Sequence, residues 1–184
     1  MKKLRLISFT LFVIASQACN GGMNNDAQLI RKDTLKTSVP IDKNDAQFAI
    51  EASIKSMAEV ELGKLAIKNG VDKRVKNFGA MLIKDHIKAD RKLRTIAKIK
   101  KISLPDSIDA KEQLSIIKLS KSYGKTFDTA FMNDMVKHHE NDIRMYTEAT
   151  KELMDPDLRV FANKNLLVLK RHLDAVNVIK GSMK

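Results

Sequence analysis

The sequence has few of the residues that build disulfide-bonded, sheet-rich or nucleotide-binding proteins. It contains one cysteine, no tryptophan and three prolines, and aromatic residues make up 5% of its 184 positions. A single cysteine excludes an internal disulfide, and the abundance of alanine, leucine, isoleucine, lysine and methionine favours helix over sheet. No Gly-x-Ser-x-Gly motif or phosphate-binding glycine-rich loop is present, so nucleophilic catalysis has little support. We expect an all-α protein, and the sequence favours a role other than that of an enzyme.

The apolar run near the N-terminus, from Leu6 to Ala15, is too short to cross a membrane, which requires about 20 apolar residues. A basic start precedes this run and small residues follow it before Cys19, so residues 1–18 are predicted to be an export signal. SQAC resembles a bacterial lipobox, with Ser16 where a large aliphatic residue is usual. We therefore expect a lipid anchor at Cys19 and a place in the cell envelope, as an outer-membrane or periplasm-facing lipoprotein. The alternative is ordinary secretion, with Cys19 incidental.

Acidic residues are scarce, because 22 Asp and Glu stand against 34 Lys and Arg, which gives a formal net charge of +12. Much of the excess lies between Asp72 and Lys101. Such a surface could attract anionic lipid or other anionic polymers of the envelope, or it could be an ordinary solvated helix face. Expected partners are therefore the membrane, through the lipid anchor, and anionic envelope polymers. Export makes nucleic acid an unexpected partner.

Beyond the signal, residues 19–43 are polar and without sustained period, which indicates a flexible tether ahead of a folded domain at 44–184. Amphipathic patterns predict long helices at 44–69, 72–101, 126–153 and 155–180, and a short helix at 109–122. Asn44 with Gln47 resembles a capping box, and Gly70 is expected to end the first helix in a left-handed conformation. Asp155 is the expected cap of the last helix, ahead of Pro156.

The lengths of the connections predict the topology. Only one or two residues separate the first and second helices, and the third and fourth, so each pair must form an antiparallel hairpin. The stretch 102–125 between the hairpins is long enough to run the length of a bundle. We therefore expect a ferritin-like antiparallel four-helix bundle with a long crossover between its second and third helices.

The two predicted hairpins also resemble each other. DKRVKNFGAMLIKDH and DPDLRVFANKNLLVLKRH both begin with a capping aspartate, reach a phenylalanine (Phe78 or Phe161) and continue to a histidine. The distance from phenylalanine to histidine differs by about one helical turn. Duplication of a hairpin and chance similarity between amphipathic helices both remain open.

All four histidines fall within long helical patterns. His86 and His172 occupy positions in the apolar stripes of their helices, and one of the adjacent His138 and His139 must also face inward. Glu59 is the carboxylate in the small-residue stripe of the first helix. Since these residues lie near the midpoints of their helices, antiparallel packing should bring them to about the same height, with Asp85 and Asp142 close by.

Buried imidazoles and carboxylates require partners, and two interpretations follow. In the first, Glu59, His86, His139 and His172 bind a metal ion, with Asp85, His138 and Asp142 as outer, orienting groups. Imidazole and carboxylate suit zinc, copper, iron or manganese. The Glu-x-x-His pattern of di-iron bundles is absent, because Ile83, Val136 and Leu169 stand three residues before the histidines. In the second, the same residues form a buried hydrogen-bonded layer that sets the register of the helices.

Four segments carry a family resemblance: FAIEASIKSMAEVELGKLAIKNG, VKNFGAMLIKDHIKAD, GKTFDTAFMNDMVKHHENDI and DPDLRVFANKNLLVLKRHLDAV. Together, from about Asp45 to Ile179, they resemble the bacterial family called domain of unknown function 4142. The resemblance implies an exported, often lipid-anchored protein with a ferritin-like helical fold. The motif positions it marks are Glu59, Asp85, His86, His139 and His172. At His138 the family more often has aspartate, which would alter the local charge.

Overall fold

We describe the protein from a computed structural model, in which residues 40–183 are placed. Within this part of the chain every element is a helix, and no strand occurs, which confirms the all-α prediction. None of these helices has an apolar stretch that could cross a membrane. The predicted export signal, the lipidation site Cys19 and the tether as far as residue 39 lie outside the described residues.

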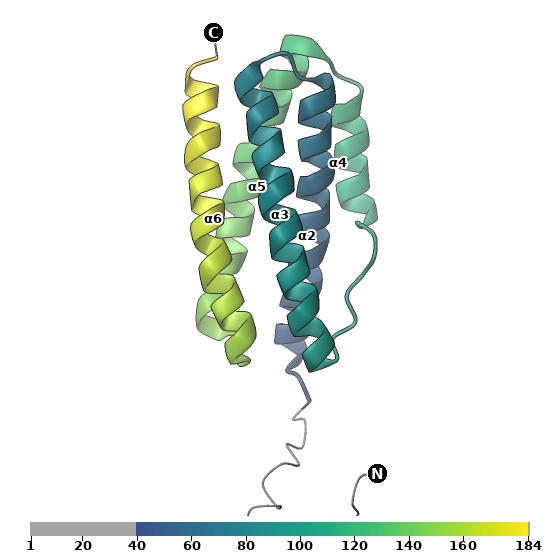
Figure 1. Cartoon of the computed structure of the whole chain (residues 1–184), viewed down its shortest axis with the longest axis vertical. Helices are drawn as coiled ribbons and strands as arrows, with labels where there is room; N and C mark the ends of the chain where they lie inside the picture. The colour runs from purple at the N-terminus through teal and green to yellow at the C-terminus, as the bar shows by residue number, and fades with distance from the viewer. Residues whose placement is uncertain (1–39, 184) are drawn as a thin grey trace, which may run out of the picture. The chain divides into compact units, whose positions relative to one another are not determined.

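Five helices follow one another along the chain (Figure 1). Helices α2 and α3 form one hairpin, helix α4 is short, and helices α5 and α6 form a second hairpin. Their bounds are Lys43–Asn69 for α2, Lys73–Lys100 for α3, Ala110–Ser120 for α4, Gly124–Glu152 for α5 and Pro156–Gly181 for α6. The sequence therefore located all five helices, with differences of one or two residues at most ends.

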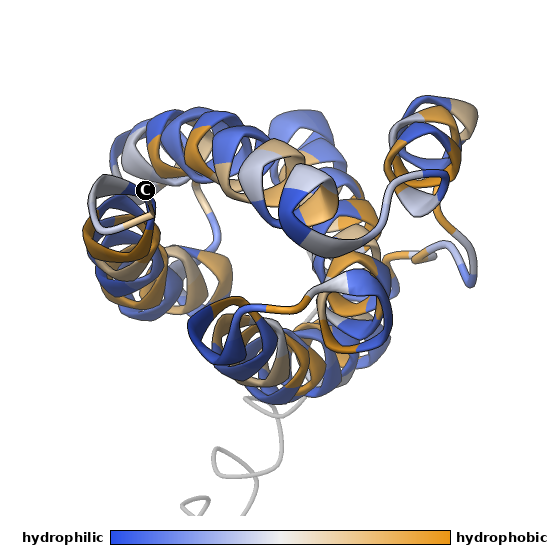
Figure 2. Ribbon diagram, turned by 90° about the horizontal axis from the view of Figure 1, so that it is seen from above, coloured by the Kyte–Doolittle hydropathy of each residue, from blue (hydrophilic) through white to orange (hydrophobic). Residues whose placement is uncertain are grey.

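The four long helices pack side by side around a shared core, and α4 lies outside them against α2 (Figures 1 and 2). Contacts join α2 to α3, α5 to α6, α3 to α6 and α2 to α5. In Figure 1, α2 and α6 run upward while α3 and α5 run downward, so each long helix is antiparallel to the two that it contacts. The middle of each helix therefore lies at about the same height as the middles of its neighbours.

Two expectations about helix ends were wrong. Asp42, and not Asn44, caps α2, because its carboxylate accepts hydrogen bonds from the backbone amides of Asn44 and Asp45. Gly70 is extended, with φ −70° and ψ 156°, and not left-handed. A glycine is needed there for space, since a Cβ atom would lie 2.7 Å from both the Ala66 carbonyl oxygen and Asp128 Oδ1.

Each hairpin turn is held by a buried aspartate from the other hairpin. Asp128 of α5 accepts hydrogen bonds from the backbone amides of Val71, at 3.2 Å, and Asp72, at 2.9 Å, in the turn between α2 and α3. Asp45 of α2 accepts from Met154, at 3.0 Å, and from Asp155, at 2.6 Å, in the turn between α5 and α6. The two hairpins thus cap each other's free backbone amides.

This reciprocity extends along the whole length of both hairpins. The first hairpin can be aligned with the second without insertions or deletions, because the same number of residues separates each matching pair. The pairs are Asp45 and Asp128, Phe48 and Phe131, Asp72 and Asp155, and Phe78 and Phe161. The contacts repeat as well. Phe48 packs edge-on against Phe161 with ring centroids 6.4 Å apart, and Phe78 packs edge-on against Phe131 with ring centroids 6.3 Å apart. These matching residues and contacts support a duplicated hairpin. The sequence comparison was weaker because it matched His86 with His172, and these two histidines do not occupy equivalent positions in the two hairpins.

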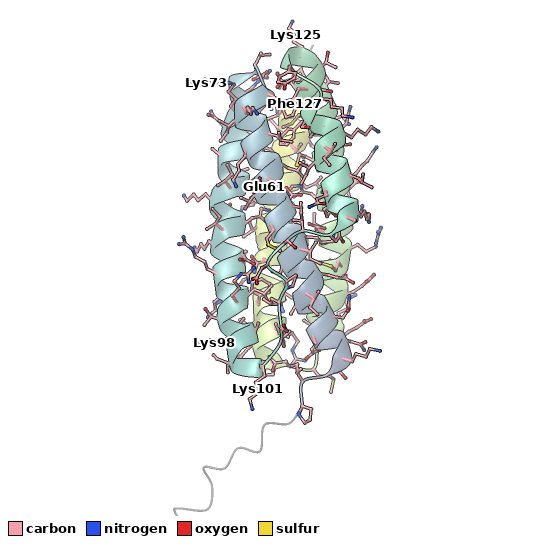
Figure 3. All side chains as sticks on the ribbon, turned by 90° about the vertical axis from the view of Figure 1, so that its right-hand side faces the viewer. Glu61, Lys73, Lys98, Lys101, Lys125 and Phe127 are labelled. Carbon is pink, nitrogen blue, oxygen red and sulfur yellow. The ribbon has the colours of Figure 1, made fainter. Side chains whose placement is uncertain are left out.

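The apolar core is divided into two clusters along the bundle. One contains Phe48, Leu93, Leu158 and Phe161, and the other contains Leu62, Phe78, Phe131 and Val176 among its buried residues. Phe127, labelled in Figure 3, belongs to the second cluster. Buried polar side chains at mid-height separate the two, and they are the residues that the sequence singled out: Glu59, His86, His139, Asp142 and His172.

Candidate metal site

Three histidines from three different helices converge at mid-height in the bundle. His86 comes from α3, His139 from α5 and His172 from α6, and they are 7%, 0% and 1% exposed. Each histidine contributes one ring nitrogen to a set of three nitrogens that all lie within 4.8 Å of one another. Phe78 closes one side, with its ring centroid 6.1 Å from that of His139 and 6.2 Å from that of His172. Three imidazole nitrogens this close together form a candidate metal site.

Two of the histidines belong to a hydrogen-bonded chain. His139 Nδ1 lies 2.8 Å from the Met135 carbonyl oxygen, and His139 Nε2 lies 3.3 Å from His172 Nδ1. At the far end, His172 Nε2 lies 3.0 Å from Asp85 Oδ2. The chain therefore begins at a carbonyl oxygen and ends at a carboxylate oxygen, both of which accept hydrogen bonds.

The number of protons shared along this row of hydrogen bonds constrains what can lie between the His139 and His172 rings. Each neutral imidazole carries one N–H. If both outer nitrogens donate, His139 to Met135 and His172 to Asp85, the two inner nitrogens face each other with lone pairs across 3.3 Å. That arrangement needs either one additional proton or a cation between or beside the two nitrogens. The same outer hydrogen bonds fix the tautomers in which His139 Nε2 and His172 Nδ1 are available as metal ligands.

His86 supplies a third nitrogen without a protein partner. Its Nε2 atom is buried and makes no hydrogen bond within the described part of the chain. Burial lowers the pKa of His86 to about 4, against the opposing effect of the Glu59 carboxylate. Burial also lowers the pKa of His172, even though Asp85 acts to raise it. Neutral imidazole is the form that binds metals, so burial favours the ligand state of both rings.

Glu59 is buried beside the histidines but is not a member of the three-histidine set. Neither carboxylate oxygen has a hydrogen-bond partner within residues 40–183, and the His138 ring lies beside it, with Nδ1 3.4 Å from Oε1. Burial acts to raise the pKa of Glu59, but the combined effects of His139, His138 and His86 outweigh it and lower the pKa to about 2. The site thus includes a buried carboxylate with unused acceptor capacity.

Two ion pairs between α2 and α5 flank the site. His138 faces Glu59, and Lys55 Nζ lies 2.7 Å from Asp142 Oδ1. The pairs are equivalent under the hairpin repeat, since Lys55 corresponds to His138 and Glu59 to Asp142. Burial works against the charge on His138, but its contact with Glu59 outweighs burial and raises its pKa. Burial raises the pKa of Asp142 in spite of Lys55.

The structure places the predicted residues as follows. It brings His86, His139 and His172 together, turns His139 and not His138 into the core, and joins Asp85 to His172. Asp142 contacts Lys55 instead of a histidine. Sequence reasoning missed Lys55 and the Met135 carbonyl. Lys55 could have been found, because it lies one turn before Glu59 on the same helix.

Two solved structures share the fold. One is a DUF305 fragment from Deinococcus radiodurans, with 11% identity and a TM-score of 0.69 over 78% of this chain and 99% of the other. The second is a DUF305 protein from Streptomyces coelicolor, which its description infers to be secreted, with 13% identity and a TM-score of 0.63 over 76% and 95%. Identities this low establish a likeness of fold alone.

The sequence comparisons are more specific to this chain. No curated protein matches it. The model of one family, described as a domain of unknown function (DUF4142), matches residues 32–179. That range includes all five helices except the last residues of α6, together with every residue of the candidate site. The chain therefore belongs to the DUF4142 family.

Proposed function

We propose that this protein binds one transition-metal ion in the middle of its bundle, through His86, His139 and His172. The observation that carries the proposal is the pair of inner imidazole nitrogens, 3.3 Å apart, whose outer nitrogens are held by Met135 and Asp85. The buried, unpartnered His86 Nε2 adds a third donor. Glu59 is the group to complete the ligand set or to balance its charge, because both of its oxygens have unused lone pairs.

The donor set narrows the metal to a class. Imidazole and carboxylate donors suit zinc, copper, iron and manganese, and the site contains no thiolate that would favour softer ions. The site residues are buried, and the cavity beside His86 measures only about 10 Å³. A cavity of that size holds a water molecule and no organic substrate. Holding or carrying the metal therefore suits the site better than catalysis on a larger molecule.

The setting we propose is an exported ferritin-like bundle, anchored to the cell envelope through Cys19. The shared direction of α3 and α5, with the long stretch 101–123 leading from the end of α3 to the start of α5, supports the ferritin-like class. The N-terminal pattern of the sequence supports export and lipidation. One structural neighbour is described as inferred to be secreted, which agrees with export.

Elemental analysis tests the proposal. The chain would be purified from the envelope fraction of a bacterial host without an added histidine tag, beside a His86→Ala, His139→Ala double variant and an Asp174→Ala control, since Asp174 is exposed and belongs to no part of the site. We expect about one metal ion per chain in the parent and in the control, and far less in the double variant. Absence of metal from the parent, even after incubation with zinc, copper and ferrous ions, would assign the histidines to the register-setting polar layer instead.

A second candidate function rests on the solvent-exposed face of α3. Apart from Arg74, which pairs with Asp72, its exposed cations make no ion pair within the described residues, and Figure 3 shows Lys73 and Lys98 near opposite ends of this helix. They are Lys73, Lys84, Lys88, Arg91, Lys92 and Lys98. We propose contact with anionic lipid or envelope polymer through this face. Binding to anionic vesicles should fall with salt and should survive the histidine substitutions, whereas Lys84→Glu, Lys88→Glu should abolish it.

A further inference from the structure

A small cavity lies against His86, on the side of the polar layer away from Phe78. Its volume is about 10 Å³, and its walls include Ser56 of α2, Ala89 of α3, Tyr146 of α5 and Leu169 of α6 as well as His86. That volume corresponds to about one water molecule. The unpartnered Nε2 atom belongs to one of the residues in its wall.

The hairpin repeat gives a physical reason for this cavity. At the spacing that relates the two hairpins, His139 corresponds to Ser56, His172 to Ala89 and His86 to Leu169. All three counterparts line the cavity. It therefore occupies the place where a second histidine cluster would stand, and two of the three imidazoles are replaced there by side chains of one or two heavy atoms. The missing volume remains as a gap in an otherwise close-packed layer.

A larger pocket reaches the same place from the surface. It has a volume of about 410 Å³ and lies between α2, α3 and the connection at 106–108. Ser56 lines this pocket as well as the small cavity against His86. Figure 3 shows the connection crossing over α2 and α3 below the labelled Glu61, which is also in the pocket wall. Ser56, itself 3% exposed, is thus shared by the solvent-facing pocket and the cavity against His86.

The charges around the pocket suit a cation. Glu61, Asp90 and Asp106 line it, against one cation, Arg91, in a protein whose formal net charge is +12. These carboxylates are partly neutralised, because Lys64 pairs with Glu61 and Arg94 pairs with both Asp90 and Asp106. The pocket therefore offers acceptor oxygens that divalent ions can contact on the way in, without a site that would retain them.

We propose that the metal ion reaches the three histidines from this pocket, by passing Ser56 between α2 and α3. This inference rests on the metal site of the proposed function and adds its route of entry. Close contact of the two helices blocks passage farther along, since a Cβ atom on Gly63 would lie 2.6 Å from the Gly79 carbonyl oxygen. Ser56 is the small side chain at which pocket and cavity meet.

Arg94 fixes the connection between α3 and α4, which forms one wall of the larger pocket. Its guanidinium donates to the Pro105 carbonyl oxygen at 3.1 Å, to Asp106 Oδ1 at 3.2 Å and to Asp90 Oδ2 at 2.7 Å. These bonds tie the connection between α3 and α4 to the body of α3. Loss of the guanidinium would free the connection without touching any histidine.

Loading kinetics test the route, with Zn²⁺ as the probe and a chromophoric chelator as the indicator. Ser56→Val fills the narrow point, and we expect Zn²⁺ uptake and release both to slow by about tenfold or more, since entry would then require helix motion. The amount bound at equilibrium should stay at the parent value, because Ser56 is not a ligand. Asn165→Val is the matched control, because Asn165 lines the same cavity from α6. Its rates should match those of the parent.

Arg94→Gln provides a second variant that does not add volume to the core, and it should load faster than the parent. Unchanged rates in Ser56→Val overturn the route, as does slowing by Asn165→Val alone, which would place the entrance between α3 and α6. If Ser56→Val does not fold, as judged by circular dichroism, an unchanged rate in Arg94→Gln overturns it. A parent chain that binds no Zn²⁺ at equilibrium would instead refute the proposed site, which keeps the two failures distinct.

Discussion

At the scale of single residues, the candidate site depends on what holds each imidazole in place. Among the described residues, Asp85 is the carboxylate within hydrogen-bond distance of a histidine of the cluster, with its Oδ2 atom 3.0 Å from His172 Nε2. It fixes the tautomer that turns the Nδ1 lone pair of His172 toward His139. Its side chain is a quarter exposed, so its removal leaves no deeply buried charge unpaired.

We expect Asp85→Ala to weaken metal binding by about 10- to 100-fold, as loss of an outer partner of a ligating histidine usually does. Stability without metal should change little. Competition titration against a chelator measures the affinity, and urea unfolding in EDTA measures the stability. Asp174→Ala, an exposed acid on the same helix as His172, is the control. Equal affinities for both variants would show that Asp85 does not orient the site.

Gly63 illustrates a second residue-scale requirement, that of space. A Cβ atom at this position would lie 2.6 Å from the Gly79 carbonyl oxygen and 2.9 Å from Ile83 Cγ1. We expect Gly63→Ala to lower the free energy of unfolding by about 1–3 kcal/mol through overpacking. Gly181→Ala, where no atom lies within 4 Å, should have a far smaller effect. Urea unfolding of both variants checks this, and a neutral Gly63→Ala would mean that α2 and α3 can separate freely.

At the scale of the elements, the two hairpins stabilise each other through their turns. Asp128 satisfies two backbone amides between α2 and α3, and Asp45 satisfies two between α5 and α6. Both aspartates are 1% exposed, so their loss would leave buried amides without acceptors. The hairpins are therefore coupled at both ends of the bundle.

We expect Asp45→Ala and Asp128→Ala each to cost about 1–3 kcal/mol of stability, the usual penalty for unsatisfied buried polar groups. The costs should be similar, because the two residues are equivalent under the repeat. Hydrogen exchange of the amides of Asp72 and Asp155 provides a local readout. If only the global stability fell, with amide protection unchanged in both turns, the capping role would be wrong.

The cap of α6 makes part of the stability depend on pH. Burial acts to raise the pKa of Asp155, but Lys100 and the amides of Leu158 and Asp157 outweigh it and lower the pKa below its ordinary 3.8. A lowered folded-state pKa means that the unfolded chain binds more protons near this pH. The stabilisation is present above pH 3.8 and is lost as the pH falls through the lowered value.

Asp155→Asn isolates this effect, because asparagine also caps helices well but cannot ionise. We expect the parent to be more stable than the variant near neutral pH, and the difference to disappear as the pH drops below the lowered pKa of Asp155. Thermal unfolding of both proteins at a series of pH values measures the difference. A difference that stayed constant down to pH 2 would show that the charge of Asp155 plays no part.

At the scale of the whole molecule, a polar layer divides the apolar core into two clusters. Buried polar groups without partners lower stability, and Glu59 and His86 both contain such atoms. A layer that only set the helix register would be expected to satisfy its own hydrogen bonds. The unsatisfied atoms are therefore more consistent with a ligand that supplies the missing partner.

We expect His86→Leu to raise the stability of the metal-free protein by about 1–2 kcal/mol, because it removes a buried nitrogen that has no partner and keeps a similar volume. Metal binding should be lost in the same variant. Urea unfolding in EDTA, alongside elemental analysis, tests both parts. A destabilised His86→Leu with a disordered core by NMR would instead favour the register-setting interpretation.

The sequence by itself determined the five helices, because the apolar period, capping aspartates such as Asp155 and the break at Pro105 act over a few residues. It also indicated most of the side chains of the polar layer, since an inward histidine or glutamate interrupts an apolar stripe. Only the tertiary structure decided that His139 and not His138 faces the core, because the two are adjacent on one helix turn and their directions depend on how α5 packs. The same holds for the extended Gly70, the Lys55 pair with Asp142, and the cavity at Ser56. Each of these features depends on which residues of a second helix, distant in the sequence, pack against it. A local sequence pattern contains no information about that packing.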